Sequence, residues 1–405
     1  MLNHPTFASW PSFTDEEANA VHKVLMSNKV NYWTGDEGRK FESEFAEWCG
    51  TKYAIAVSNG TLALELSLRA IGILPGDEVI VTPRTFIASV SCIVNVGAIP
   101  VFADVDIISG NITAKTISSK ITQKTRAIIC VHLAGWPCDM DPIIDLGKSH
   151  NIKIIEDCAQ AHGAQYKGRS VGGIGDVAAW SFCQDKIMTT GGEGGMVTTN
   201  NKALWLSMWA YKDHGKSYEA VYERKHPVGY KWLHESFGTN YRMLEIQACI
   251  GRIQLKKMPQ WNQIRNKYAK KIHESCAKFP AIRPTIFRCN SCGCDNLCAT
   301  SSGCTNAFYK CYIYLDLKAL KKGWTRDRVI TEITNLGVPC MQGVCPEVYL
   351  EKSIAQSGLA PDNRLPIAKE LGDISMMFLV HPTLNEHDID NTCDAIEKVI
   401  TLASN

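Results

Sequence analysis

Three short polar sequences carry the residues whose types and spacing could do chemistry. They are SNGT (58–61), EDCAQ (156–160) and a lone lysine, Lys186, which is followed by the glycine-rich TTGGEGG (189–195). Free backbone N–H groups at a helix that opens with the Gly-Thr of SNGT would favour an anion, commonly phosphate. A partly desolvated lysine after a buried strand is the kind that forms a Schiff base. Each feature alone is also explained by ordinary structure, as a helix cap, a solvated strand end or a surface lysine.

Taken together, the three sequences describe a pyridoxal phosphate site. The phosphate would lie at the helix that begins at Gly60, a carboxylate of EDCAQ would face the pyridinium nitrogen, and Lys186 would attach to the cofactor. Phe86, at the end of another predicted strand, is available to cover one face of the ring. The glycines after Lys186 would let the backbone approach the ligand without a clash from a Cβ atom.

The elements that must position these residues form an alternating pattern between about residues 50 and 200. Short apolar runs alternate there with helical patterns, which predicts a mostly parallel sheet covered by helices on both faces. Such sheets bind ligands at the carboxyl ends of their strands, and the polar sequences follow apolar runs at those ends. The predicted strands are 53–57, 78–82, 99–105, 125–132 and 153–157, and the predicted helices are 61–72, 85–95 and 140–150.

The pattern changes beyond about residue 240, where one long helical stretch leads into a region of mixed strands and helices. We therefore predict an α/β protein with a mostly parallel central sheet and a smaller α+β C-terminal domain. The long helix is expected over 241–279, strands at 308–316 and 376–382, a helix at 325–337 and a last helix capped by Asn385. The expected division is a large domain with an N-terminal arm, 1–260, and a small domain, 261–405.

The composition is that of an ordinary globular protein. The 405 residues are 45% hydrophobic and carry a formal net charge of +2, without the concentrated basic charge of nucleic-acid-binding or membrane-surface proteins. The uncharged run 85–102 contains Asn95, Gly97 and Pro100, which favour a helix followed by a strand over a membrane span. No signal peptide is recognisable, and the 17 mostly scattered cysteines are typical of free thiols in a reducing cytoplasm.

One cluster of cysteines stands apart from the scattered ones. Its CxxCxC spacing could hold zinc or an iron–sulfur centre, but no second CxxC or HxxxH follows at the spacing of a zinc finger. We therefore expect no bound metal, and we keep four residues of this cluster as weak candidates. They are Cys289, Cys292, Cys294 and Cys298, and Cys304 follows them.

Longer stretches around the polar sequences resemble a known family. SNGTLALELSLRAIGILPGDEVIVTPRTF, IIEDCAQAHGAQYKGRSVGGIGDVAAWSF with the following lysine and TTGGEGG, and FGTNYRM are similar to the DegT/DnrJ/StrS sugar aminotransferases. The similarity is strong over about residues 30–260 and weaker near the C-terminus. It implies a fold-type-I pyridoxal phosphate transferase, with the fold of aspartate aminotransferase, acting on nucleotide-linked keto-sugars.

The resemblance implies a role for each matching residue. Lys186 would form the internal aldimine, and Asp157 would pair with the pyridinium nitrogen. His214 and Arg242 match family positions that line the sugar or donor pocket, although structural hydrogen bonding explains them equally well. Asn240, in NYRM, would reach across a dimer interface to the phosphate in the neighbouring subunit. The remaining cofactor contacts would be Gly60, Thr61, Phe86, Gln160 and Ser181.

The activity that the resemblance implies is amino transfer from L-glutamate to a nucleotide-linked keto-sugar, in a cytoplasmic homodimer with shared active sites. By family frequency the acceptor is a 4-keto-6-deoxy hexose, and the amino sugar serves surface-glycan synthesis. Some relatives are dehydratases that use pyridoxamine phosphate and carry histidine in place of the lysine. Lys186 favours the aminotransferase over this alternative, and over a regulator that binds the cofactor without turnover. The nucleotide and the aminated carbon stay open.

Overall fold

The core of the molecule is a seven-stranded sheet in the order β1–β9–β8–β5–β4–β2–β3. The computed structural model describes residues 7–283 and 303–404. Neighbouring strands from β3 to β8 pair in parallel, and β9 runs antiparallel to both β8 and β1, which confirms a mostly parallel sheet. The strands are β1 (Tyr53–Val57), β2 (Glu78–Val81), β3 (Ile99–Phe102), β4 (Thr125–Val131), β5 (Lys153–Asp157), β8 (Val177–Ser181) and β9 (Gly195–Thr199).

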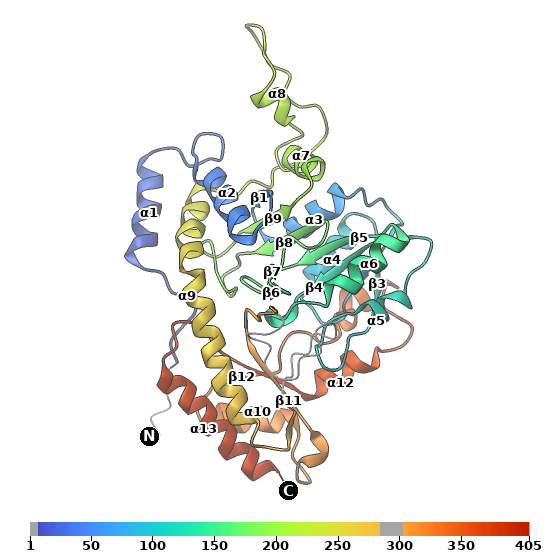
Figure 1. Cartoon of the computed structure of the whole chain (residues 1–405), viewed down its shortest axis with the longest axis vertical. Helices are drawn as coiled ribbons and strands as arrows, with labels where there is room; N and C mark the ends of the chain where they lie inside the picture. The colour runs from blue at the N-terminus through green and yellow to red at the C-terminus, as the bar shows by residue number, and fades with distance from the viewer. Residues whose placement is uncertain (1–6, 284–302, 405) are drawn as a thin grey trace.

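Helices lie on both faces of this sheet, so its strands are buried on both sides (Figure 1). Alternate residues of one strand accordingly belong to two apolar clusters: in β1, Ile55 packs with one and Ala56 with the other. Leu64 of α3 belongs to the first cluster and Phe45 of α2 to the second. These helices are α2 (Glu37–Cys49), α3 (Gly60–Ala70), α4 (Ala88–Asn95), α5 (Ala114–Ser118), α6 (Met140–His150) and α7 (Lys202–Tyr211).

The C-terminal part is built on a second, antiparallel sheet in the order β10–β11–β13–β12. Its strands are β10 (Ile282–Arg283), β11 (Cys311–Leu315), β12 (Cys340–Met341) and β13 (Ser375–Phe378). Helices α10 (Arg326–Asn335), α11 (Lys352–Ala355), α12 (Pro366–Ile374) and α13 (Glu386–Ala403) accompany it. As predicted, Asn385 caps α13, because its side chain accepts from the amide of Asp388 at 3.0 Å.

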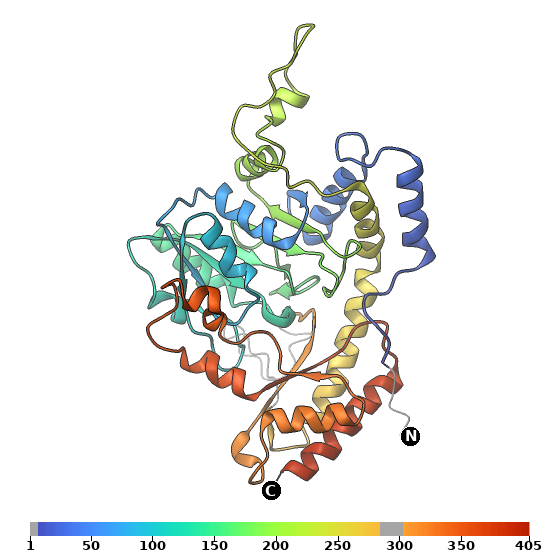
Figure 2. The ribbon, with the colours of Figure 1, turned by 180° about the vertical axis from the view of Figure 1, so that it is seen from behind.

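Helix α9 (Glu245–Cys276) runs along one side of the molecule, from the large sheet to the C-terminal helix α13 (Figures 1 and 2). It corresponds to the long helix predicted over 241–279. Helix α1 (Asp15–Met26) and α2 pack against its first half. Residue 260, where we divide the two domains, lies inside this continuous helix, and the division stays a prediction.

A long excursion of the chain projects from the part of the molecule built on the large sheet, beyond α7. We call residues 212–240 the projecting arm; it contains α8 (Tyr218–Tyr222) and stands clear of the body in both ribbon views (Figures 1 and 2). Hydrogen bonds between the chain near Ser217 and the chain near Leu233 hold its two branches together. None of the helices in the described ranges is both long and apolar enough to cross a membrane.

Most of the cysteines lie within the described residues, and the others lie outside them. No disulfide joins any of the cysteines within residues 7–283 and 303–404, in agreement with the expectation of thiols for that part of the chain. Cys304 is buried, and its sulfur accepts from the amide of Lys167 at 3.3 Å. The weak metal candidates Cys289, Cys292, Cys294 and Cys298 lie outside the described residues.

Candidate active site

A cavity of about 820 Å³ lies where the carboxyl ends of the large-sheet strands face the C-terminal sheet. The structure brings most of the sequence-predicted residues together in its wall, although they are spread over more than a hundred positions. Residues of the C-terminal part, among them Tyr309 and Lys310, line the same cavity. The predicted residues that line it are Gly60, Thr61, Phe86, Asp157, Gln160, Ser181 and Lys186.

The amino end of α3 forms a cradle for an anion on one side of the cavity. Asn59 caps the helix by accepting from the amide of Leu62 at 2.9 Å. Gly60 lets the helix lie directly against the end of β8, because a Cβ atom there would stand 2.6 Å from the Cβ atom of Ser181. The hydroxyl-bearing residues Thr61 and Ser181 therefore meet beside the free amides of the first helical turn. This set of donors fits a phosphate.

Asp157 ends β5 as a buried carboxylate with neutral hydrogen-bond donors. Ser89 donates to its Oδ2 atom at 2.7 Å, and the amide of Ala159 donates to Oδ1 at 3.1 Å. Within the described residues no cationic side chain forms an ion pair with it. Burial raises the pKa of Asp157 above its ordinary value, although these hydrogen bonds and the nearby charges of Lys186 and His132 act in the opposite direction. A cationic group in the cavity would therefore be stabilised next to it, as the pyridinium nitrogen of pyridoxal phosphate would be.

Lys186 faces the cavity from the loop after β8, with 16% of its side chain exposed. Its Nζ atom lies 3.3 Å from Oδ1 of Asp185 and 5.2 Å from the centre of the Tyr309 ring. Its backbone oxygen accepts from Nε1 of Trp10 at 2.8 Å, which ties the lysine loop to the N-terminal segment. The Tyr309 hydroxyl donates to Asp185, and the Asp185 carboxylate is therefore bound by both Lys186 and Tyr309.

The glycines after Lys186 meet steric requirements of the protein's own backbone. A Cβ atom on Gly194 would lie 2.0 Å from Oγ1 of Thr190, and one on Gly195 would lie 2.4 Å from the backbone oxygen of Asn59. Gly191 and Gly192 have φ angles of +87° and +122°, which other residues rarely adopt. Gly195 therefore lets β9 pass close to the start of α3, and Gly194 leaves room for the Thr190 side chain. The expectation that these glycines make room for a ligand stays a prediction.

Phe86 and Gln160 both line the cavity, but they differ in how exposed their side chains are. Phe86 is 65% exposed, at a position from which a ring can cover a ligand. Gln160 is buried, and its Oε1 atom accepts from the amide of Ala134 at 2.8 Å. That hydrogen bond fixes the side chain and leaves the amide nitrogen of Gln160 as the group that can donate to a ligand.

Asn240, His214 and Arg242 do not line this cavity of their own chain. They lie at the base of the projecting arm, where Arg242 Nη1 pairs with Oδ1 of Asp213 at 2.6 Å. His214 and Asn240 are exposed there. The expected contact of Asn240 with a neighbouring subunit stays a prediction.

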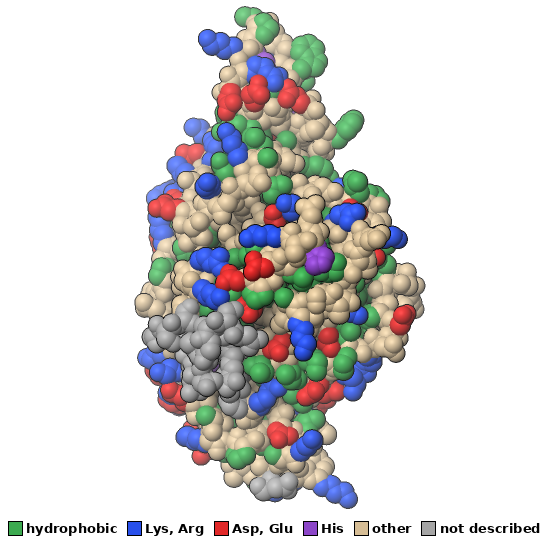
Figure 3. All heavy atoms as spheres, turned by 45° about the vertical axis from the view of Figure 1, so that its right-hand side comes forward, with side chains coloured by type: hydrophobic (Ala, Val, Ile, Leu, Met, Phe, Trp, Pro, Cys, Tyr) green, Lys and Arg blue, Asp and Glu red, His purple; other side chains and the backbone are tan. Residues whose placement is uncertain are grey.

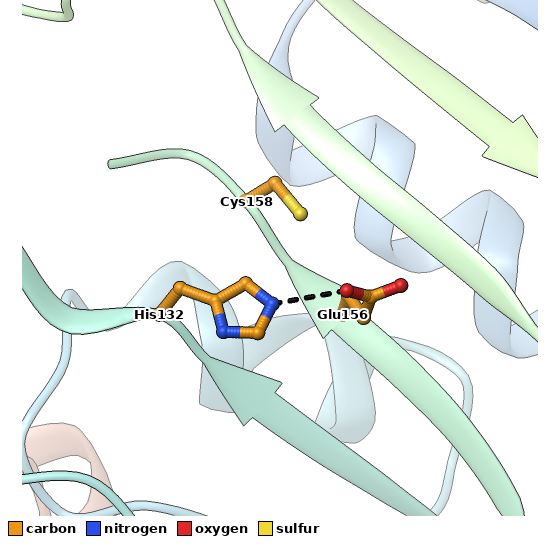
Figure 4. A group of neighbouring side chains, drawn as sticks. All are labelled: His132, Glu156 and Cys158. Atoms are coloured by element: carbon orange, nitrogen blue, oxygen red, sulfur yellow. Dashed lines mark hydrogen bonds and ion pairs between the residues drawn. The ribbon is translucent and has the colours of Figure 1, made fainter. Parts of the chain in front are cut away.

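A second polar cluster, His132, Glu156 and Cys158, lies buried behind the site (Figure 4). Glu156 Oε1 accepts from the amides of Ile174 and Gly175, both at 2.8 Å, and Oε2 accepts from His132 Nε2 at 3.1 Å. His132 Nδ1 accepts from a backbone amide, so the neutral ring carries its proton on Nε2. Although burial opposes it, these donors hold the pKa of Glu156 below its ordinary value. The cluster is therefore structural, because its ligand atoms are already engaged.

Sequence reasoning missed several residues of the site. Ser89 follows Phe86 by one helical turn, so its proximity to a strand-end site could have been inferred from the spacing. Asp185 precedes Lys186 directly and was overlooked. Tyr309 and Lys310 lie more than a hundred residues downstream, and no local pattern marks them.

The comparisons with known proteins agree with this geometry. Residues 11–397 match the model of the DegT/DnrJ/EryC1/StrS aminotransferase family. This chain belongs to that family. The aminotransferase is 35% identical over 371 residues to the GDP-perosamine synthase of Caulobacter vibrioides, covering 91% of this chain and 92% of the relative. It is 44% identical over 270 residues to the GDP-perosamine synthase of Escherichia coli O157:H7, covering 65% of this chain and 70% of the relative.

The solved structures give the same result. An aminotransferase from Psychrobacter cryohalolentis superimposes on this aminotransferase with a TM-score of 0.93 and 59% identity, covering 98% of this chain and 99% of that one. The expected fold-type-I architecture is confirmed, together with the assignment to a family of sugar aminotransferases.

The burial of the Asp157 charge predicts how its substitution affects stability. A carboxyl whose pKa is raised by folding contributes most below its unfolded pKa, and this contribution is lost as the pH rises through the folded value. We therefore expect the cofactor-free Asp157→Asn variant to melt at a higher temperature than wild type at pH 8. The difference should shrink toward pH 4, as followed by calorimetry.

Asp141 provides a control, because its substitution should change the melting temperature in the opposite direction. Burial opposes the shift, but Lys167 and Arg169 lower the pKa of Asp141, so Asp141→Asn should lower the melting temperature at pH 8 and not at pH 3. An Asp157→Asn variant that is less stable than wild type at every pH would contradict the prediction, because it would show that the hydrogen bonds outweigh the buried charge.

Proposed function

We propose that this aminotransferase uses pyridoxal 5′-phosphate to transfer the amino group of L-glutamate to a nucleotide-linked keto-sugar. The assignment of the cofactor rests on one observation. A buried carboxylate without an ion-pair partner among the described residues shares a cavity with a lysine and with the amino end of a helix. The family and the perosamine synthase relatives support the sugar substrate. The resemblance of the sequence motifs supports glutamate as donor and a 4-keto-6-deoxy hexose as acceptor.

The residues present would hold the cofactor by its charged groups. Gly60, Thr61 and Ser181 would bind the phosphate at the start of α3, and Asp157 would keep the ring nitrogen protonated. Phe86 would cover the ring, and Gln160 would donate to its oxygen substituent. When bound, pyridoxal phosphate supplies an electron sink that stabilises negative charge at the carbon bearing the transferred nitrogen.

Lys186 is the group placed to move protons in the cavity. Its amine takes the proton from the α-carbon of the donor and returns a proton to the former carbonyl carbon of the sugar. Asp185, at 3.3 Å, stabilises the ammonium form between these steps. The donor leaves as its 2-oxo acid before the keto-sugar enters, so the two substrates use one site in turn. A dehydratase is the alternative, and the presence of Lys186 favours the transfer.

The half-reaction tests this proposal. Protein reconstituted with pyridoxal phosphate should lose its yellow absorbance on addition of L-glutamate and release one equivalent of 2-oxoglutarate per site. A nucleotide-linked 4-keto-6-deoxy hexose should restore the absorbance and yield an amino sugar. Lys186→Ala should slow the transfer by roughly 10²- to 10⁴-fold, the contribution typical of a positioned proton-transfer group.

Lys148→Ala is the matched control, because Lys148 is an exposed lysine on α6, and its rate should equal that of wild type. Two results would refute the proposal: a Lys186→Ala enzyme with the wild-type rate, or a product that has lost a hydroxyl group without gaining nitrogen. The second result would instead identify a dehydratase.

We infer further that two copies of the chain form a homodimer with shared active sites. Several large hydrophobic side chains of the projecting arm are exposed, and the space-filling view shows hydrophobic side chains at its end (Figure 3). The arm also carries Asn240, which the family pattern assigns to the phosphate of the neighbour. Its most exposed hydrophobic residues are Val228, Tyr230, Trp232 and Phe237.

Charged substitutions on the arm test the dimer. Wild type should sediment at twice the chain mass of 44.9 kDa, and a Trp232→Asp, Phe237→Asp double variant should shift toward the monomer and lose transfer activity. Leu74→Asp is the control, because Leu74 is 64% exposed on another part of the large domain. A monomeric wild type would contradict the inference. We place the enzyme in the cytoplasm on its cysteine content, an assignment that rests on the sequence alone.

A further inference from the structure

The C-terminal sheet presents a cation to the cavity. Lys310 directly precedes β11 and lines the cavity opposite the strand ends of the large sheet. Its Nζ atom lies 5.1 Å from the centre of the Tyr309 ring, and Lys186 Nζ lies 5.2 Å from the same centre. The two amino nitrogens are therefore at most about 10 Å apart. Among the described residues, no carboxylate forms an ion pair with Lys310.

The surroundings of Lys310 are positively charged. Burial, with the charges of Arg265 and Lys186, lowers the pKa of Lys310 to about 8, and Asp185 acts in the opposite direction. Asp185 is itself engaged by Lys186 and the Tyr309 hydroxyl. At neutral pH the amine of Lys310 is therefore mostly protonated, in a wall where an additional anion would be stabilised.

The backbone that carries Lys310 is held in place on both sides. Arg265 Nη1 of α9 lies 3.3 Å from the backbone oxygen of Phe308 and 3.4 Å from that of Tyr309. The Tyr309 side chain is in turn bound to Asp185 of the lysine loop. The position of Lys310 relative to Lys186 is thus fixed by packed elements of both domains, as a specific binding contact requires.

We propose that Lys310 binds a carboxylate of the amino donor. The proposal rests on the proposed function, in which the donor nitrogen takes the place of the Lys186 nitrogen. An amino acid carries its α-carboxylate on the carbon that bears that nitrogen, and glutamate extends a second carboxylate a few bonds further. The diphosphate of a sugar nucleotide, in contrast, is separated from a 4-keto carbon by the whole sugar ring. A cation at most about 10 Å from Lys186 is within reach of these carboxylates, and we therefore assign Lys310 to the donor.

The test separates donor binding from sugar binding. Lys310→Met keeps the length of the side chain and removes its charge, and we expect the KM for L-glutamate to rise by roughly 10- to 100-fold, as the loss of a charge-assisted hydrogen bond produces. The KM for the nucleotide keto-sugar should stay within about twofold of wild type. Lys310→Arg should recover part of the donor affinity. Lys318→Met, on an exposed lysine of the same domain, should match wild type.

Comparison of donors identifies the carboxylate. If Lys310→Met weakens L-alanine and L-glutamate alike, Lys310 binds the α-carboxylate; if it weakens only L-glutamate, it binds the side-chain carboxylate. Either result supports the proposal. An unchanged KM for every donor would overturn it, and so would a rise confined to the nucleotide sugar, which would assign Lys310 to the diphosphate.

A binding measurement keeps this proposal distinct from the proposed function. Glutarate carries two carboxylates but no amino group, and its Kd for the protein can be measured by calorimetry without turnover. Lys310→Met should weaken glutarate binding by roughly tenfold or more, and equal affinity would overturn the proposal. If wild type fails to react with L-glutamate, the proposed function is wrong as stated, and the glutarate measurement still decides whether Lys310 binds a carboxylate.

Discussion

A buried carboxylate without a cationic partner among the described residues is the constraint on which the rest of the site depends. Asp157 ends β5 in the interior, where its hydrogen bonds come from Ser89 and a backbone amide, both neutral. Burying such a charge without an ion-pair partner is costly, and the burial outweighs the nearby charges of Lys186 and His132, so a cation in the cavity beside Asp157 would be stabilised. In our proposal that cation is a protonated pyridine ring, and the ion pair with Asp157 would prepare the ring to withdraw electrons.

The other residues of the site follow from how the two sheets place them around this carboxylate. Gly60 lets α3 approach β8, which sets the anion cradle at one end, and Lys186 projects from the loop that β8 leads into. The C-terminal sheet closes the cavity with Tyr309 and Lys310. In our proposal, cofactor binding and proton transfer therefore come from residues around the large sheet, whereas recognition of the donor comes from a residue beside the C-terminal sheet.

Much of this arrangement could be predicted from the sequence, because parallel strands are continuous apolar runs and polar residues at their ends share one edge of the sheet. Asp157, Lys186 and Gly60 were found in this way. Lys310 could not be found, because its place opposite Lys186 depends on how the second domain packs. The glycines after Lys186 suggested ligand contact, and the structure shows a requirement that the pattern did not indicate, because Gly195 accommodates the backbone of Asn59. Local sequence does not reveal which neighbour requires a small residue.

The most direct test of the account is the protonation state of the bound cofactor. The ring nitrogen of ¹⁵N-labelled pyridoxal phosphate can be observed by NMR in the wild-type protein and in Asp157→Asn. We expect a protonated nitrogen at pH 8 in wild type and a neutral one in the variant, because the buried carboxylate is what favours the cation. A neutral ring nitrogen at pH 8 in wild type would contradict the central role of Asp157.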